Sequence, residues 1–507
     1  MGSPPGHAGR SWRAAGTARL VQPAVPVTAA AASGRARARA LAAVRPSERQ
    51  LAWQSMEFYG FIHFGMNTMT NREWGEGHDD PAAFDPAGLD ADQWVAALKS
   101  AGMTGVILTC KHHDGFCLWP SDVTAYSVAS SPWRGGKGDV VAEVADAARR
   151  HGLWFGIYLS PWDRTEASYG SGTAYDDFYA AQLTELLTRY GPVFSVWLDG
   201  ANGEGPNGKR QIYDWERYYA VVRELQPDAV IGVCGPDVRW CGNEAGDTRP
   251  DEWSVVPRAL QDGERTADRS QKADDGTFAR LVRSDDRDLG SRAALVGHED
   301  DLVWYPAEVN TSIRPGWFHH PAEDVQVRSV DELFTIYLRA VGGNSCFLLN
   351  VPPARDGRIR DTDVAVLEQL GRRIDDFRSR RIEATATTVS SGTPGDVATA
   401  WPGAAGRTPW RPDGTDPRPG VTLAFGRLRP VEAVVVGENI TQGQRIEHVV
   451  VRGRRDGRWT TLAEAHAVGY QRILTFTPVE VDAVLVEVTE ARDTPVVAHV
   501  TAIGAAS

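Results

Sequence analysis

The sequence predicts an α/β fold, a (β/α)8-like barrel followed by a C-terminal all-β sandwich, and three observations support this prediction. Short β-rich runs alternate with amphipathic helical patterns from about residue 48 to about residue 350, which is typical of parallel strands joined by crossover helices. Polar and aromatic side chains gather where these strands end. After residue 380 the helical patterns stop, and short alternating strands follow one another with turn residues between them.

Six apolar runs have the length and the β-branched and aromatic content of buried parallel strands. These runs are 59–65, 104–110, 153–160, 193–199, 229–235 and 345–351. Between them, apolar residues recur at helical spacing, with acidic residues near the start of each pattern, at 90–102, 139–152, 174–191 and 215–225. So many strand–helix units over about 300 residues suit a closed barrel better than a doubly wound open sheet.

The barrel is expected to occupy residues 48–383 and to end in a helix at 361–380. The segment 384–507 has the spacing of strands and turns that is typical of a sandwich. It carries no obvious binding motif, so its expected role is to support the barrel. Between about residues 261 and 301 the chain is polar and lacks a clear period, and such a run inside a domain is often a lid or a binding loop.

Residues 1–47 differ from the rest of the chain, because they contain seven arginines and no acidic residue. This composition is interpreted as a disordered or targeting-like arm. Prolines interrupt the apolar stretch at 20–34, so the sequence has no clear signal peptide. Both a cytoplasmic and a secreted location therefore stay open, as does the oligomeric state.

The composition argues against several classes of partner. A net charge of −12 disfavours nucleic acid and anionic membrane surfaces, and no segment approaches the ~20 apolar residues of a membrane span. The five cysteines are scattered and lack zinc-like spacing, so no metal is expected. The stretch 203–208 matches the letters of a dinucleotide-binding pattern, but it starts about four residues past the end of a strand, and no clear strand with a terminal acidic residue follows about 20 residues later. No cofactor is therefore expected.

The residues that follow the strands of a barrel converge on one mouth. Here these residues are His63, Glu73, Trp74, His112, His113, Asp114, Tyr158, Trp197, Asp199, Arg239, Trp240 and Glu244. Neighbouring side chains on an extended chain point to opposite sides, so His112 and His113 make a poor metal site. Contact with a substrate is the favoured interpretation of the histidines, with structural hydrogen bonding as the alternative. Asp199, taken alone, could also begin a turn before Gly200.

This combination of side chains is typical of sugar chemistry. Sugar hydroxyls need donors and acceptors at fixed angles, and the apolar face of a sugar ring stacks on indole rings, of which the chain has 17. Cleavage of a glycosidic bond needs two carboxyl groups: one attacks or activates water, and the other protonates the leaving oxygen. The residues at the strand ends therefore predict a glycosidase pocket.

A series of motifs resembles, in order and in spacing, the α-L-fucosidases of glycoside hydrolase family 29. The motifs are "FYGFIHFGMNT", "REWGEG", "TCKHHDGFCLWPS", "GLWFGIYLSPWDR", "VWLDGANGEG", "RWCGNEAG", "EVNTSIRPGWFHH" and "FLLNVPP". Together they cover about residues 48–385. The forms "HFGMNT…EWGEG" and "SIRPGW" are similar to the subfamily that favours α-1,3/1,4-linked fucose on branched glycans.

The resemblance implies a retaining exo-α-L-fucosidase that releases L-fucose from fucosylated oligosaccharides or glycoconjugates by double displacement, without metal or cofactor. It implies that Asp199 is the nucleophile and that Glu244, in the "GNE" element, is the general acid/base. The competitors for the second role are Asp237, Asp247, Glu252 and Glu308. The residues implied to bind the substrate are His63, Glu73, Trp74, His112, His113, Tyr158, Trp197, Arg239, Trp240 and Trp317.

Two other functions stay open at this point. A glycosidase acting on a related deoxy-sugar or a galactoside would use the same carboxylates, and a pocket that holds the C6 methyl group against apolar side chains would favour fucose. A fucose-binding lectin without catalysis is an alternative from a different class. The presence of Asp199 and Glu244 counts against the lectin, and turnover of a nitrophenyl fucoside excludes it.

Overall fold

The predicted barrel is a single eight-stranded parallel sheet that nearly closes on itself, as in TIM barrels. The computed structural model describes residues 27–264, 266, 288–388, 409–413, 416 and 418–506. The strand order in the barrel sheet is β5-β4-β3-β2-β1-β10-β9-β6. The strands are β1 (Phe58–Ile62), β2 (Gly105–Lys111), β3 (Trp154–Leu159), β4 (Ser195–Leu198), β5 (Val230–Val233), β6 (Arg239–Trp240), β9 (Ala307–Ser312) and β10 (Cys346–Asn350). A parallel bridge between Gly232 and Val238 brings the two ends of the sheet together.

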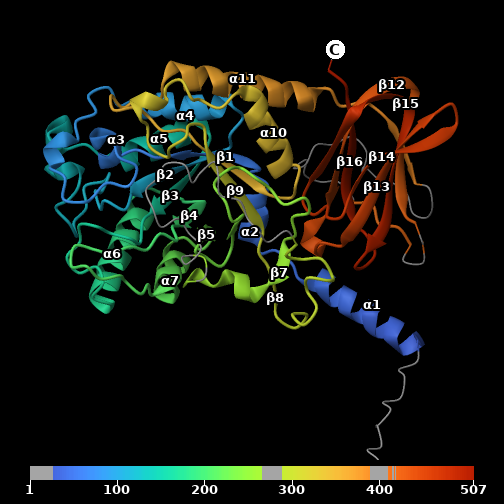
Figure 1. Ribbon diagram of the computed structural model, residues 1–507, viewed down its shortest axis with the longest axis horizontal. Coiled ribbons are helices and arrows are strands. Elements are labelled where there is room, and N and C mark those ends of the chain that lie inside the picture. The colour runs from blue at the N-terminus through green and yellow to red at the C-terminus, as the bar shows by residue number, and fades with distance from the viewer. Residues whose placement is uncertain are drawn as a thin grey trace, which may run out of the picture.

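Helices surround the barrel (Figure 1). The five predicted helical segments form α4 (Ala91–Ser100), α5 (Val140–His151), α6 (Thr173–Arg189), α7 (Trp215–Leu225) and α11 (Asp361–Ser379). The described part of the barrel also contains α2 (Glu48–Gln54), α3 (Met66–Thr70) and α10 (Val330–Ala340). Asp139 begins α5 by accepting a hydrogen bond from the Ala142 N–H at 2.8 Å, and Gly152 ends it in the left-handed conformation at φ +73°. No helix in the described part of the chain is long and apolar enough to cross a membrane.

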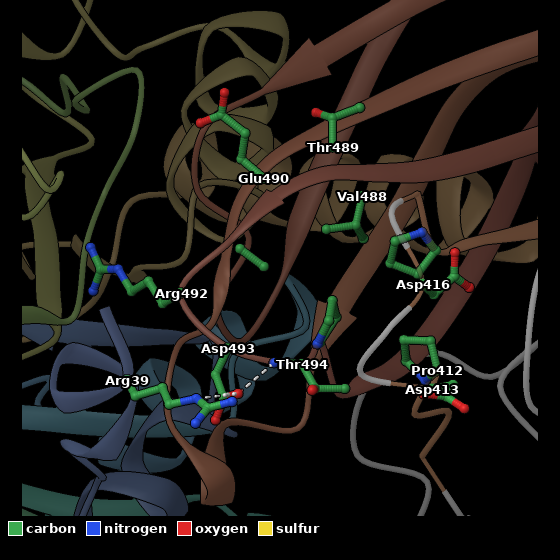
Figure 2. A pocket seen from close by; sticks show the side chains of 13 residues that line it. Arg39, Pro412, Asp413, Asp416, Val488, Thr489, Glu490, Arg492, Asp493 and Thr494 are labelled. Atoms are coloured by element: carbon green, nitrogen blue, oxygen red, sulfur yellow. Dashed lines mark hydrogen bonds and ion pairs between the residues drawn. The ribbon is translucent and has the colours of Figure 1, made fainter. Parts of the chain in front are cut away.

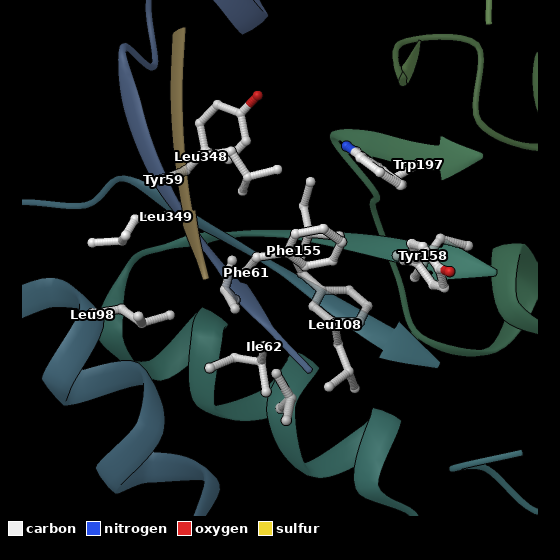
Figure 3. Close-up of a cluster of buried hydrophobic side chains, with 14 of the residues drawn as sticks. Tyr59, Phe61, Ile62, Leu98, Leu108, Phe155, Tyr158, Trp197, Leu348 and Leu349 are labelled. Carbon is white, nitrogen blue, oxygen red and sulfur yellow. The ribbon is translucent and has the colours of Figure 1, made fainter. Parts of the chain in front are cut away.

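The side chains of the strands alternate between the barrel interior and the layer under the helices. In the outer layer, Leu98 of α4 lies so close to Gly60 that a Cβ atom on Gly60 would be 2.6 Å from it. In the interior, the ring centroid of Phe61 lies 5.8 Å from that of Tyr158 and 5.3 Å from that of Trp197 (Figure 3). These rings form an aromatic layer beneath the mouth of the barrel.

Two strands of the barrel, β6 and β9, are not among the six predicted runs. Strand β6 has only two residues, and β9 alternates polar and apolar positions. The polar side chains of β9 are buried hydrogen-bond acceptors and donors: Glu308 accepts from Trp197 Nε1, Asn310 accepts from Trp240 Nε1, and Ser312 accepts from Asn350 Nδ2. The barrel interior therefore contains a polar network next to its aromatic layer.

The C-terminal domain is all-β, as predicted, and the strands that the structure describes there pair antiparallel. Its strands are β11 (Thr385–Thr388), β12 (Gly420–Glu438), β13 (Ile446–Arg455), β14 (Arg458–Ala465), β15 (Arg472–Ala491) and β16 (Val497–Gly504). The two long strands β12 and β15 pair with each other from Gly420 opposite Glu487 to Val436 opposite Arg472, with register shifts. Their buried valines, such as Val434 and Val484, pack in one apolar core with residues of the other strands.

Barrel and C-terminal domain are joined by polar and apolar contacts. A small antiparallel pair, β7 (Val255–Pro257) and β8 (Leu302–Trp304), extends from the barrel toward the domain. The Ser254 N–H donates to Gln444 Oε1 at 2.9 Å, and the Tyr470 N–H donates to Asn344 Oδ1 at 2.8 Å. Much of the polar segment that we expected to form a lid or a binding loop lies outside the described residues, between 264 and 288.

The N-terminal segment, expected to be a disordered or targeting-like arm, contains a helix, α1 (Val27–Ala43), while residues 1–26 lie outside the described residues. The segment is rich in alanine and arginine, which have high helix propensities. Leu41 and Ala42 are buried, and Arg39 lies 3.7 Å from Asp493 of the C-terminal domain. Figure 2 shows this ion pair at a pocket with an empty volume of about 770 Å³, which Val488 also lines. The end of α1 thus packs against the C-terminal domain.

Candidate active site

Residues at the mouth of the barrel line a pocket, which is where a barrel is expected to bind a small molecule. Its lining residues are Phe61, His63, Trp74, His112, His113, Trp197, Asp199, Ala201, Val233, Trp240, Glu244 and Trp317. Nine of the twelve residues predicted from the sequence are in this set. The pocket therefore brings both predicted catalytic carboxyl groups together with the predicted histidines and tryptophans.

Asp199 follows β4 and faces the pocket, where its carboxylate is held by two donors. The Tyr158 hydroxyl donates to Oδ2 at 2.8 Å, and the Ala201 N–H donates to Oδ1 at 2.7 Å. Burial raises the pKa of Asp199, and these hydrogen bonds act in the opposite direction because they stabilise the ionised form. The two donors also fix the orientation of the Asp199 carboxylate, which suits a predicted nucleophile, because its attacking oxygen must face one carbon atom of the substrate.

Glu244 lies on the loop between β6 and β7 and faces the same pocket. The indole Nε1–H of Trp317 donates to Glu244 Oε2 at 3.1 Å. The pKa of Glu244 is raised to about 8, mainly by burial and also by the negative charges of Asp199 and Glu73, while the hydrogen bond from Trp317 acts in the opposite direction. Glu244 is therefore protonated at neutral pH, as a general acid must be.

We expect the pH profile of kcat/KM to have a basic limb set by Glu244. Activity toward a substrate with an unactivated leaving group should fall as pH rises through about 8, because Glu244 then loses the proton that it must donate. Trp317→Phe removes a hydrogen bond that favours the ionised carboxylate, so the basic limb should move to higher pH. A basic limb that keeps its position in Glu244→Gln would assign it to another group.

Three histidines line the pocket and are neutral. Burial lowers the pKa of His63 to about 3, and it lowers the pKa values of His112 and His113 well below the usual range for histidine. Each ring has its Nδ1 within hydrogen-bond distance of a polar side chain: Asn350 for His63, Asn67 for His112 and Ser160 for His113. No cluster of three or more potential metal ligands occurs among the residues that the structure describes.

Aromatic rings form much of the pocket wall. Trp197 stacks against Tyr158, with ring centroids 5.4 Å apart and an interplanar angle of 30°. Trp74 meets His113 edge-on at 5.7 Å, and the Nε1–H of Trp240 donates to Asn310 Oδ1 at 3.0 Å. These contacts fix the indole rings in place, so that their faces can pack against the apolar side of a sugar.

Three residues predicted to bind the substrate do not line the pocket: Tyr158, whose hydroxyl donates to Asp199, and Glu73 and Arg239. The carboxylate of Glu73 accepts hydrogen bonds from the backbone N–H of Trp317 and from His320 Nε2, so it supports the loop that carries Trp317. Arg239 is buried and forms an ion pair with Glu252. The predictions for Glu73 and Arg239 assumed that a polar side chain after a strand points into the mouth, and in these two cases the side chain has a buried partner elsewhere.

The structure also separates the five candidates for the acid role, all of which it describes, because only Glu244 lines the pocket. Glu308 lies deeper in the barrel, where it accepts hydrogen bonds from Tyr59 and from Trp197 Nε1. Glu252 is paired with Arg239 and Arg249, and Asp237 is paired with Arg223. Asp247 is the remaining candidate, and it is not among the lining residues.

Sequence reasoning missed the apolar part of the pocket, which Phe61, Ala201 and Val233 provide. Val233 has a φ of +66°, a backbone conformation that is rare for a β-branched residue and marks local strain. It lies at the end of β5, where its N–H donates to Val238 O at 3.1 Å and helps to close the barrel. Phe61 could have been found from the sequence, since it lies two residues before His63 on the same face of β1.

Comparison with known proteins agrees with the geometry of the pocket. The family model described as alpha-L-fucosidase matches residues 66–376, which include Asp199 and Glu244. The chain belongs to the α-L-fucosidase family, glycoside hydrolase family 29. It is therefore a glycoside hydrolase.

Individual members of the family match over most of their length. Alpha-L-fucosidase 1 from Arabidopsis thaliana is 39% identical over 465 residues, covering 90% of this chain and 86% of the relative. A solved structure of a glycoside hydrolase 29 family member from an unknown rumen bacterium is 34% identical, with a TM-score of 0.74, covering 92% of this chain and 78% of that one. A Ruminococcus gnavus fucosidase of family 29, solved in complex with fucose, is 26% identical with a TM-score of 0.79, covering 92% and 95% of the two chains.

Proposed function

We propose that this α-L-fucosidase family member is a retaining exo-enzyme that removes terminal L-fucose by double displacement. The observation that carries this proposal is the pairing, in one pocket, of Asp199 with Glu244. Asp199 is hydrogen-bonded in a way that favours its ionised form, whereas the pKa of Glu244 is raised to about 8. Burial raises the pKa of both groups, but the donors to Asp199 stabilise its carboxylate form, as a nucleophile requires, whereas Glu244 keeps its proton at neutral pH, as a general acid requires.

The chemistry divides into two steps. In the first, an Asp199 carboxylate oxygen attacks C1 of the sugar while Glu244 gives its proton to the glycosidic oxygen, so the C1–O bond breaks and the rest of the glycan leaves as an alcohol. The sugar is then bound to Asp199 as an ester. In the second, the Glu244 carboxylate takes a proton from water, the water oxygen attacks C1, and Asp199 is released as a carboxylate.

The apolar part of the pocket supports fucose as the sugar. Fucose has a methyl group at C6 where galactose has a hydroxymethyl group. Phe61 and Val233 line the pocket and offer apolar contact to a methyl group, whereas a hydroxyl placed against them would lose its hydrogen bonds. This difference favours a fucosidase over a galactosidase, and the fucose found in the related Ruminococcus gnavus structure agrees with it.

We propose that the natural substrates carry α-1,3- or α-1,4-linked fucose on branched glycans, on the basis of the "HFGMNT…EWGEG" and "SIRPGW" motifs. The test is release of fucose from a panel of Lewis-type and 2'-linked oligosaccharides. Preferential cleavage of the Lewis-type compounds is the expected result. Preferential cleavage of 2'-linked fucose would contradict the linkage proposal, and failure to turn over a nitrophenyl α-L-fucoside would contradict the enzymatic function itself.

We further propose that residues 48–383 form the catalytic domain and that residues 384–507 act as its support. The C-terminal domain contacts the barrel through backbone and side-chain hydrogen bonds, among them Arg472 Nη2 to Pro250 O at 2.7 Å. Among the residues from 384 onward that the structure describes, none lines the pocket. These contacts suit a domain that stabilises the barrel from outside.

Replacement of His63, His112 or His113 by alanine is expected to cost about 1–3 kcal/mol of transition-state binding each, because a sugar hydroxyl would lose its partner. The measurement is kcat/KM on an aryl α-L-fucoside, with His298→Ala as the matched control, since His298 is exposed and outside the pocket. If all three pocket variants stay within twofold of the unmodified enzyme, the histidines have a structural role instead.

A further inference from the structure

The three pocket histidines lie next to one another, and each is hydrogen-bonded at Nδ1 by a side chain behind it. The ring centroids of His63 and His112 are 5.7 Å apart, and those of His112 and His113 are 3.9 Å apart. A neutral imidazole carries one hydrogen, so a partner at one nitrogen decides whether the other nitrogen donates or accepts. We propose that Asn350, Asn67 and Ser160 hold these rings in fixed alternating tautomers, so that the pocket wall presents an acceptor, a donor and an acceptor to the sugar.

The tautomer of His112 follows from the orientation of Asn67. The Nδ2 of Asn67 lies 3.2 Å from the backbone oxygen of Glu73 and 3.1 Å from His112 Nδ1. A carbonyl oxygen can only accept, so the amide atom that faces Glu73 O must be the NH2 group, since the flipped amide would place two oxygens in contact. Asn67 therefore donates to His112 Nδ1. The hydrogen of this ring is on Nε2, which becomes a donor.

The tautomer of His113 follows from Ser160. The Ser160 hydroxyl donates to the backbone oxygen of Trp162 at 2.7 Å, which uses its one hydrogen. His113 Nδ1 lies 2.7 Å from the same Ser160 oxygen, so the ring must be the donor in this contact. His113 Nε2 is then bare, and it lies 4.0 Å from Asp199 Oδ2. A bare nitrogen at this position accepts from a sugar hydroxyl and places no positive charge on the nucleophile.

The tautomer of His63 follows from Asn350. The Nδ2 of Asn350 donates to the backbone oxygen of Trp317 at 2.8 Å and to Ser312 Oγ at 2.9 Å, which fixes the amide orientation. Asn350 Oδ1 accepts two hydrogen bonds from His63, one from the ring Nδ1 at 2.9 Å and one from the backbone N–H at 3.2 Å. The hydrogen of His63 is therefore on Nδ1, and Nε2 is an acceptor.

The alternation deepens the proposed function, on which it rests for the identity of the sugar. Two sugar hydroxyls must donate, to His63 and to His113, and one must accept, from His112. Asn350, Asn67 and Ser160 touch no substrate in this arrangement and act as positioning residues through the rings that they hold. A sugar that offers its hydroxyl hydrogens in another pattern leaves at least one buried group unpaired, which makes the order of donors and acceptors a specificity filter.

The hydrogens can be located without any substrate, by 15N NMR of the full-length protein labelled at histidine, with signals assigned from single histidine variants. The expected spectrum has the hydrogen on Nδ1 of His63 and His113 and on Nε2 of His112. The opposite tautomer, or a protonated ring, at any of the three positions overturns the inference. Because this measurement uses the free protein, its failure is distinguishable from failure of the fucosidase proposal.

A second test uses methyl α-L-fucoside and its analogues in which a single hydroxyl is replaced by hydrogen or by fluorine. Fluorine accepts weakly and cannot donate, so at the hydroxyl bound by His112 the fluoro analogue should inhibit about fivefold better than the deoxy analogue. At the hydroxyls bound by His63 and His113 the two analogues should be equally weak. Three positions with the same fluoro-to-deoxy ratio would overturn the inference.

Two matched substitutions complete this test. Asn67→Asp replaces the donor at His112 Nδ1 by an acceptor, so the fluoro advantage should disappear and methyl α-L-fucoside should bind about 10- to 100-fold more weakly. His298→Ala changes an exposed histidine outside the pocket and should leave the pattern of fluoro-to-deoxy ratios unchanged. An unchanged ratio in Asn67→Asp, or a lost ratio in His298→Ala, contradicts the inference.

Discussion

Asp199→Ala is expected to lower turnover of an aryl α-L-fucoside by several orders of magnitude, because in the proposed mechanism the Asp199 carboxylate forms the bond to C1. Among the residues that the structure describes, the two carboxyl groups that line the pocket are those of Asp199 and Glu244. The Tyr158 hydroxyl and the Ala201 N–H hold the two oxygens of Asp199. Among the described residues, the Asp199 side chain caps no helix and forms no ion pair with a lysine or an arginine, so the fold should survive. Thermal unfolding of the variant, compared with that of the unmodified enzyme, checks this.

Azide makes the test specific for a nucleophile. It fits the space left by the carboxylate and attacks C1 from the same side, so Asp199→Ala should regain part of its activity and give β-fucosyl azide. The unmodified enzyme should give no β-fucosyl azide, since the Asp199 carboxylate occupies the space that azide would need. Near-normal turnover by Asp199→Ala without azide would move the nucleophile to another residue.

Glu244→Gln is expected to separate substrates by their leaving group. The amide keeps an oxygen that can accept the Trp317 indole hydrogen, but it cannot supply a proton. Cleavage of an oligosaccharide should therefore fall by about 10²- to 10⁴-fold, the usual contribution of a general acid. The first step with an activated aryl fucoside should hardly change, because that leaving group departs without protonation.

The matched control for this prediction is Asp247→Asn, which removes a carboxylate from the same loop outside the pocket. It should cleave a Lewis trisaccharide at close to the normal rate. If Glu244→Gln cleaves that trisaccharide normally, the acid lies elsewhere, and Asp247 and Glu308 become the residues to test.

The sequence predicted the barrel because six of its strands are continuous apolar runs that alternate with amphipathic helices. Strand β9 was not predicted, because every second residue along it is polar. These residues, Glu308, Asn310 and Ser312, take part in a polar network inside the barrel. Hydrophobic periodicity cannot recognise a strand whose buried side is polar. The helix α1 was missed for a related reason, because its composition is typical of disorder and its stability comes in part from contacts with distant residues such as Asp493.

Most of the candidate site could be predicted because strand ends converge in a barrel, whatever the details of the loops. The position of a residue after a strand does not reveal which way its side chain points, however. Glu73 turns to the backbone of Trp317, and Arg239 turns to Glu252, so neither lines the pocket. The tautomers of the histidines are also beyond the sequence, because Asn67 and Ser160 act on them through contacts that only the folded chain creates.

The most direct test of a double displacement at Asp199 and Glu244 is the configuration of the first sugar released. A 1H NMR time course of the unmodified enzyme acting on an aryl α-L-fucoside resolves the two anomers before they interconvert. The proposed mechanism predicts that α-L-fucose appears first and that the β anomer follows only by mutarotation. Initial release of β-L-fucose would contradict it, because that product requires a single displacement by water.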